Sequence, residues 1–96
     1  MSADEYEPDW EFAEGEGYVA DVKTKGRHLR LFSALSMTTG GWGAYLYDMG
    51  ARRWLVEREF ADNRDDGKIK AEIFAAAEIG GELPAVEWRR SPSKQR

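Results

Sequence analysis

The stretch that decides the fold is 40-GGWGAYLYDMGARRWLVEREF-60, the densest apolar part of the chain. It holds two of the four tryptophans and two of the four tyrosines. Its side chains alternate in character along 42–48 and again along 52–60. This is the period of a β-strand, in which successive side chains point to opposite faces. Because the tight turn DMGA joins the two segments, the stretch predicts a β-hairpin.

Two further strands precede this hairpin. The segments at 18–25 and 28–36 show the same alternation, and a short turn at Gly26 joins them. Together with 42–48 and 52–60, they give four strands in two successive hairpins. We expect an antiparallel meander, because short turns join neighbouring antiparallel strands.

A helix is predicted after the sheet, at about 64–79, where the period of the sequence changes. Asn63 is a suitable N-cap, and Asp66 three residues later resembles a capping box with Asp in place of Glu. Gly80 supplies the stop. The apolar stripe expected to face the sheet consists of Ile69, Ile73, Ala76 and Ala77.

These elements predict an α+β fold of two layers, a four-stranded antiparallel meander sheet with one C-terminal helix packed on one face. The segment 82–88 follows in extended form, and Pro84 favours an edge or free position for it. Its apolar residues, which we expect to close one end of the core, are Leu83, Val86 and Trp88. By alternation, the sheet turns these residues to the core: Tyr18, Ala20, Val22, Leu29, Leu31, Leu35, Trp42, Ala44, Leu46, Trp54, Val56 and Phe60.

The charge of the chain is unevenly distributed, although the 96 residues have a net charge of only −4. Residues 1–17 carry seven acids and no base, whereas residues 89–96 carry four bases and no acid. Blocks of like charge repel and stay solvated. We therefore expect a disordered acidic arm at 1–15 with its tryptophan in water, a single domain at 16–89, and a basic disordered tail at 90–96. The alternative is an arm that folds back on a basic surface or docks on a basic partner.

The composition indicates a cytoplasmic protein that does not enter the membrane. Cysteine is absent, which excludes disulfides and thiol catalysis and fits a reducing compartment. The first residues have neither the basic region nor the apolar region of a secretory signal. No run of residues approaches the length of about 18 apolar residues that a membrane span needs.

The sequence offers little for catalysis or metal binding. His28 is the only histidine, so a metal site would have to be rich in carboxylates. The nearest candidates, Asp65 and Asp66, lie at the expected helix start, where capping explains them. Ser33 could pair with His28, but a third group of a catalytic triad is missing. We therefore expect no enzymatic activity, no cofactor and no metal.

The candidate binding site is the face of the sheet turned away from the helix. By alternation it carries aromatic side chains among bases, and the residues predicted to bind are Phe32, Tyr45, Tyr47, Arg53 and Arg30. Tyrosine and arginine are enriched at the centres of protein interfaces. The same combination can stack nucleic-acid bases. An ordinary half-wet sheet face with cross-strand aromatic pairs would give the same pattern.

Two functional hypotheses follow from this face. The first is a small non-enzymatic interaction module that binds a protein partner, or associates with itself as a homodimer, through an exposed aromatic surface. The alternative is a nucleic-acid-binding accessory protein with a stacking platform and an autoinhibitory acidic arm. The acidic net charge disfavours the alternative, because phosphate binding needs a positive footprint. No motif is specific enough to indicate a family.

Overall fold

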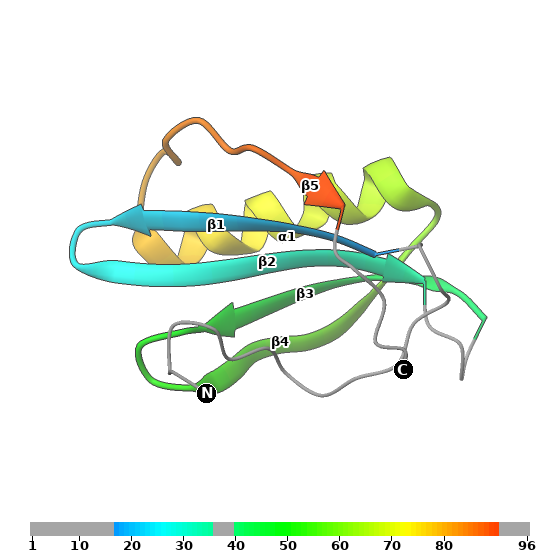
Figure 1. Ribbon diagram of the computed structural model, residues 1–96, viewed down its shortest axis with the longest axis horizontal. Coiled ribbons are helices and arrows are strands. Elements are labelled where there is room, and N and C mark those ends of the chain that lie inside the picture. The colour runs from blue at the N-terminus through cyan, green and yellow to red at the C-terminus, as the bar shows by residue number, and fades with distance from the viewer. Residues whose placement is uncertain (1–16, 36–39, 91–96) are drawn as a thin grey trace.

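The computed structural model describes residues 17–35 and 40–90. These residues form a five-stranded antiparallel sheet with one helix packed on one of its faces (Figure 1). The strands are β1 (Gly17–Thr24), β2 (Arg27–Leu35), β3 (Trp42–Asp48), β4 (Arg53–Ala61) and β5 (Arg89–Arg90), and the helix is α1 (Arg64–Ile79). The predicted two-layer α+β fold is confirmed, and the bounds of each long element lie within one residue of the prediction.

The order of strands in the sheet is β4-β3-β2-β1-β5. The four long strands thus form the predicted meander, and β5 adds a short fifth strand that the sequence did not indicate. Its two residues pair with Tyr18 and Val19 of β1. The chain before it packs against the core through Leu83, Val86 and Trp88, as predicted. The acidic arm expected at 1–15 and the tail beyond Arg90 lie outside the described residues.

Helix α1 is capped at both ends by the predicted residues. The Asn63 side-chain oxygen accepts a hydrogen bond of 2.9 Å from the Asp66 backbone N–H. The Asp66 carboxylate in turn accepts one of 2.9 Å from the Asp62 N–H. At the other end Gly80 has a left-handed backbone, with φ at 86°, and its N–H bonds to the Ala76 carbonyl. Both ends of the helix are therefore fixed by local sequence.

We expect Asn63→Ala to lower the free energy of unfolding by about 1 kcal/mol, because one helix N–H loses its acceptor. Asn63→Asp keeps an acceptor at this position and should remain close to the parent protein. Urea denaturation of the three proteins measures the difference. Equal losses in both variants would contradict a capping role for this side chain.

The helix faces the sheet with small residues and not with the predicted stripe. Gly67, Ala71 and Ala75 are buried, whereas Ile69 and Ile73 are 56% and 58% exposed. The reason is the close approach of α1 to β2. A Cβ atom on Gly67 would clash with the hydroxyl of Ser33, so a larger side chain does not fit between helix and sheet.

Strand β4 is irregular, and its alternation cannot be followed from the sequence. Its register against β3 shifts at two places, each time with an extra residue on β4. Such bulges rotate the following side chains to the other face of the sheet. The pairs that define the shifts are Ala44 with Glu59, Leu46 with Val56, and Tyr47 with Trp54.

The bulges overturn three predicted side-chain positions. Trp54 was expected in the core under the helix but packs on the opposite face of the sheet. Leu55 was expected on that opposite face but packs against the core under the helix. Phe60, also expected in the core, is 60% exposed. Strand β4 therefore contributes to both faces of the sheet.

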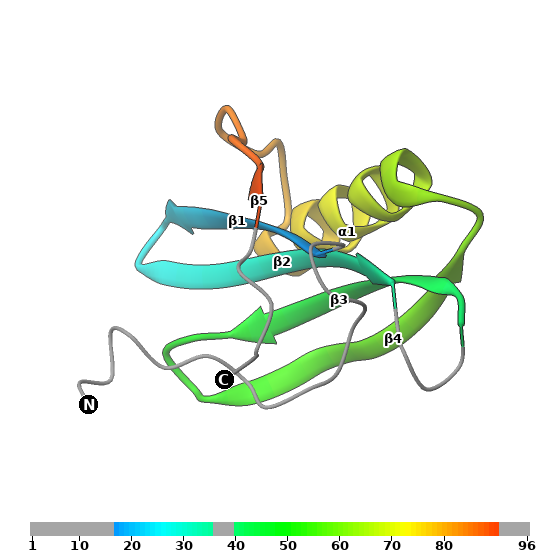
Figure 2. The ribbon, with the colours of Figure 1, turned by 45° about the vertical axis from the view of Figure 1, so that its right-hand side comes forward.

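The sheet carries an apolar cluster on each face. The first lies under the helix and consists of Val22, Leu29, Leu31, Ala44, Leu46, Ala71 and Ala75. The second lies on the other side and consists of Val19, Phe32, Ala34, Tyr45 and Tyr47, with Met49 and Trp54 packed against it. We call this second side the helix-free face. Within 17–35 and 40–90, no helix or strand lies over it (Figure 2).

Candidate functional site

The residues of the helix-free face form rows across the strands. One row consists of Val19, Phe32 and Tyr45, and the next of Asp21, Arg30, Tyr47 and Trp54. Residues directly opposite one another on antiparallel strands share a face. The register therefore brings together four of the five residues predicted to bind, which are Phe32, Tyr45, Tyr47 and Arg30.

Trp54 lies at the centre of the aromatic group. Its ring centroid is 5.0 Å from that of Tyr47, 5.8 Å from that of Tyr45 and 5.9 Å from that of Phe32. All three contacts are tilted or edge-on, which are arrangements that aromatic pairs favour. The sequence missed this role of Trp54, because the bulge that turns the ring to this face leaves no mark in the alternation.

The rings of the helix-free face are buried, in contrast to the exposed surface that the sequence predicted. The exposed fraction is 0% for Phe32, 8% for Tyr45 and 4% for Tyr47. Their packing around Trp54, with Val19 at one side, removes ring surface from water. The free face of a sheet in a two-layer fold is usually polar. Here it is a second apolar core.

Arg53 is the predicted binding residue that does not belong to this face. It pairs with Asp48, one position beyond the pair of Tyr47 and Trp54. Adjacent residues of a strand point to opposite sides, so Arg53 lies on the helix side of the sheet. The extra residue at Leu55 explains the difference, because it inverts the alternation along β4.

Arg58 takes the place on the helix-free face that the sequence assigned to Arg53. Its side chain lies over Gly43, where an added Cβ atom would be 3.1 Å from Arg58 Cγ and 3.4 Å from a ring carbon of Tyr45. Glycine at this position thus leaves room for the arginine stem. Arg58 is exposed, so it can contact a molecule bound on this face.

The Asp21 carboxylate gathers three basic side chains at the β1 side of the face. Arg30 Nε and His28 Nε2 both lie 2.8 Å from Asp21 Oδ1, and Arg89 lies 3.2 Å from Oδ2. Burial of the carboxyl group opposes ionisation. The hydrogen bonds from Arg30 and His28, with the charges of Arg30 and Arg89, outweigh burial and hold the pKa of Asp21 below its ordinary value.

We expect Asp21→Asn to lower the free energy of unfolding at neutral pH by about 1 kcal/mol, because the charge-assisted hydrogen bonds are lost. A lowered folded-state pKa means that the unfolded chain binds more protons near its own pKa. The contribution of Asp21 is therefore present above about pH 4 and disappears as the pH falls through the folded-state pKa. The difference in free energy of unfolding between parent and variant should disappear over the same pH range.

Urea denaturation between neutral and acidic pH checks this expectation. Asp65→Asn is the matched control, because its carboxylate is 71% exposed and contacts only Arg64 in the described part of the chain. Its effect should be much smaller, because an exposed ion pair contributes little to stability. A gap between parent and Asp21→Asn that persists in acid would show that the carboxylate charge is not the cause.

The groups considered for catalysis and metal binding are held apart or have structural roles. His28 is on the helix-free face, whereas the Ser33 hydroxyl is on the helix side and donates a hydrogen bond of 2.8 Å to the Arg64 carbonyl. Among the described residues, no group of three or more His, Asp or Glu side chains is arranged to hold a metal ion. In the same ranges, α1 is too short and too polar to cross a bilayer.

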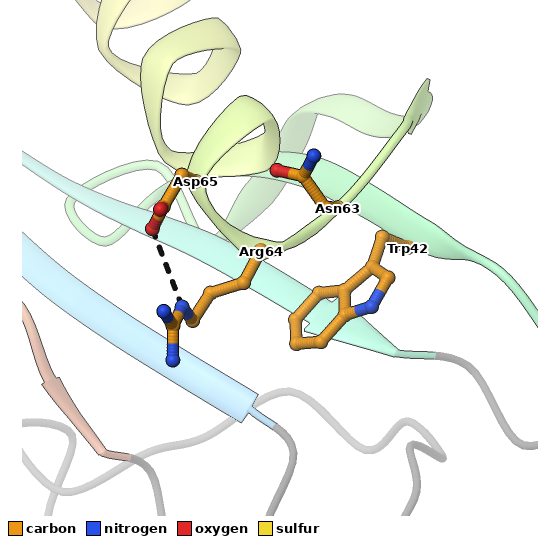
Figure 3. Close-up of a pocket in the computed structure, with 4 residues that line it drawn as sticks. All are labelled: Trp42, Asn63, Arg64 and Asp65. Carbon is orange, nitrogen blue, oxygen red and sulfur yellow. Dashed lines mark hydrogen bonds and ion pairs between the residues drawn. The ribbon is translucent and has the colours of Figure 1, made fainter.

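A pocket of about 280 Å³ lies at the start of α1 and is lined by Trp42, Asn63, Arg64 and Asp65 (Figure 3). Its polar side chains already have partners. Arg64 Nε lies 3.2 Å from Asp65 Oδ1, and the Arg64 guanidinium lies 5.6 Å from the centre of the Tyr18 ring. Asn63 caps the helix. We therefore regard this pocket as part of the helix start and the helix-free face as the candidate site.

Comparison of the chain with known protein families, with curated protein sequences and with solved structures gave no match. The helix-free face itself is therefore the basis for a function.

Proposed function

We propose that this chain is a small non-enzymatic interaction module that binds a protein partner, or a second copy of itself, through the helix-free face. The observation that carries the proposal is the aromatic cluster around Trp54, on the side of a two-layer fold that normally meets water. Aromatic and arginine side chains provide most of the binding energy in protein interfaces. We also assign the module to the cytoplasm, because the chain has no cysteine.

Each part of the face has a role in this proposal. The rings of Phe32, Tyr45 and Tyr47 provide the apolar centre. Arg58 and Arg89 are exposed and provide a basic rim that contacts carboxylates of the partner. A partner that fits this face is an acidic segment with apolar or aromatic side chains, because complementary charge directs the encounter and sets specificity.

The nucleic-acid alternative has less support. Base stacking needs open ring faces, whereas these rings pack against Trp54 at angles of 53° to 74°. The net charge of −4 also opposes phosphate binding. We expect the chain to bind single-stranded RNA or DNA no tighter than about 10⁻⁴ to 10⁻⁶ M at physiological salt. Fluorescence anisotropy over a salt series measures this. Nanomolar binding that weakens with a log–log slope of about −0.7 per phosphate contact would favour the alternative.

Two arginines of β4 provide a matched test of the proposed function. Arg58→Glu and Arg53→Glu make the same charge change at exposed positions of one strand, but the first lies on the helix-free face and the second on the helix side. Partners are cross-linked to each protein in cells and quantified, and self-association is measured by sedimentation over a concentration series. We expect Arg58→Glu alone to lose the association. Equal results for both variants would contradict the proposal.

A further inference from the structure

The helix-free face is more deeply buried than its own residues explain. Phe32 lies in the centre of the sheet and is 0% exposed, although no helix or strand of the described ranges lies over it. A ring that stands on an uncovered sheet face contacts its neighbours through its edges and leaves its outer end in water. Burial this complete therefore requires a covering layer.

We propose that the covering layer is the N-terminal segment of the same chain, residues 1–16, which lies over the helix-free face in extended form. The inference rests on the proposed function in taking this face as the binding surface. The inference adds the identity of the segment that covers this face in the isolated chain. It also reverses the expectation that the arm stays in water.

The sequence of this segment has the period that the proposal requires. Residues 5–12 are EYEPDWEF. In an extended chain alternate side chains share a side, so one side carries Tyr6, Pro8, Trp10 and Phe12 and the other carries Glu5, Glu7, Asp9 and Glu11. The first side is aromatic like the face beneath it, and the second is fully acidic. The segment is thus a strongly two-sided strand.

The position of Gly17 brings this segment to the face. Gly17 begins β1 and pairs with Ala34, which is a member of the second cluster. An extended chain advances about 3.3 Å per residue, so Phe12 can lie up to about 17 Å from Gly17. The row of Val19, Phe32 and Tyr45 crosses three strands, or about 10 Å. The aromatic side of the segment can therefore reach the rings.

Charge favours the same arrangement. Residues 1–17 carry seven acids and no base. The helix-free face carries Arg30, Arg58 and Arg89, with Asp21 already bound to two of them. Carboxylates at the margins of the segment meet the exposed arginines, and added salt weakens this attraction.

A paramagnetic label tests where the segment lies. The chain has no cysteine, so Ala13→Cys in the full chain accepts a single nitroxide close to Trp10 and Phe12. We expect the nitroxide to broaden the NMR signals of the Val19 methyl groups and the Tyr45 ring. The methyl groups of Ile69 and Ile73 project from the far side of α1 and should stay sharp. Equal broadening of both sets, or none, would overturn the proposal.

Two variants of the labelled chain test the cause. Trp10→Ala with Phe12→Ala removes the aromatic side, and Trp10→Glu with Glu11→Trp keeps composition and charge but moves the tryptophan to the acidic side. We expect the first to abolish the selective broadening and the second to reduce it several-fold. Unchanged methyl shifts of Leu29 and Leu46 report that the core is intact. Full broadening in the first variant would contradict the proposed contact.

A mixture of chains separates this proposal from its alternatives. Nitroxide-labelled chains without isotopes are mixed with isotope-labelled chains without nitroxide. We expect no broadening in the second set, because each segment covers its own sheet. Broadening there would assign the segment to a second copy and overturn the intramolecular form. The isolated chain is sufficient for this experiment, so its result is independent of whether Arg58→Glu loses a partner.

Discussion

Replacing Phe32 by alanine is expected to lower the free energy of unfolding by about 3–5 kcal/mol, which is the range for a large side chain deleted from a core. Phe32 is fully buried and contacts the aromatic group around Trp54. Its loss removes the centre of the second cluster and leaves a cavity. A position on an ordinary solvated sheet face would give a far smaller loss.

Two further variants show how large this loss of stability is compared with losses at a buried and at an exposed position. Leu31→Ala, at the neighbouring and equally buried position on the helix side, should cost about 2–5 kcal/mol. Phe60→Ala removes the same side chain from a position that is 60% exposed and should have little effect. Denaturation in urea or by heat compares the three. If Phe32→Ala resembled Phe60→Ala, the helix-free face would not be a core.

Gly67→Ala is expected to cost about 2 kcal/mol, although alanine favours helices over glycine by about 1 kcal/mol. The added methyl group would clash with the Ser33 hydroxyl and lie 3.1 Å from Ser33 Cβ, so α1 must move away from β2. Overpacking of this kind costs about 1–3 kcal/mol, and the displaced helix also loses contact with the first cluster.

Gly81→Ala is the matched control for this substitution. An added methyl group there would meet only the end of the Lys25 side chain, at 3.7 Å, and should change stability little. Ser33→Ala in combination with Gly67→Ala should cost less than the sum of the two single changes, because the hydroxyl is one cause of the clash. Additive losses would show that the contact with Ser33 is not responsible.

The elements of this fold are predictable from local sequence, because local chemistry forms them. Alternation marks the four long strands, and the side chains that cap α1 mark its ends, so each prediction lies within one residue of the structure. The two residues of β5 are too few to show a period. Which side of α1 meets the sheet depends on the distance between the helix and the sheet. The positions of Ile69 and Ile73 in the sequence do not show that distance.

The candidate site was predictable only where the strands are regular. Phe32, Tyr45 and Tyr47 lie on regular parts of β2 and β3, and alternation places them on one face. Trp54 and Arg53 precede the bulges of β4, so alternation carried across the strand from Val56 assigns both to the wrong side. The burial of the rings was missed as well, because the pattern within a strand does not show how closely the rings of neighbouring strands pack on Trp54.

The irregular course of β4 also has a consequence for solubility. An edge strand with evenly spaced N–H and C=O groups can add strands from other molecules and grow into fibrils. β4 is an edge of this sheet, but two extra residues interrupt its spacing, and Lys70 donates a hydrogen bond of 2.9 Å to the Phe60 carbonyl. The charges of Glu57, Arg58 and Glu59 stand along the same edge. Under the proposed function, the molecule would meet another protein face-on, while its irregular and charged edge disfavours a growing stack of copies.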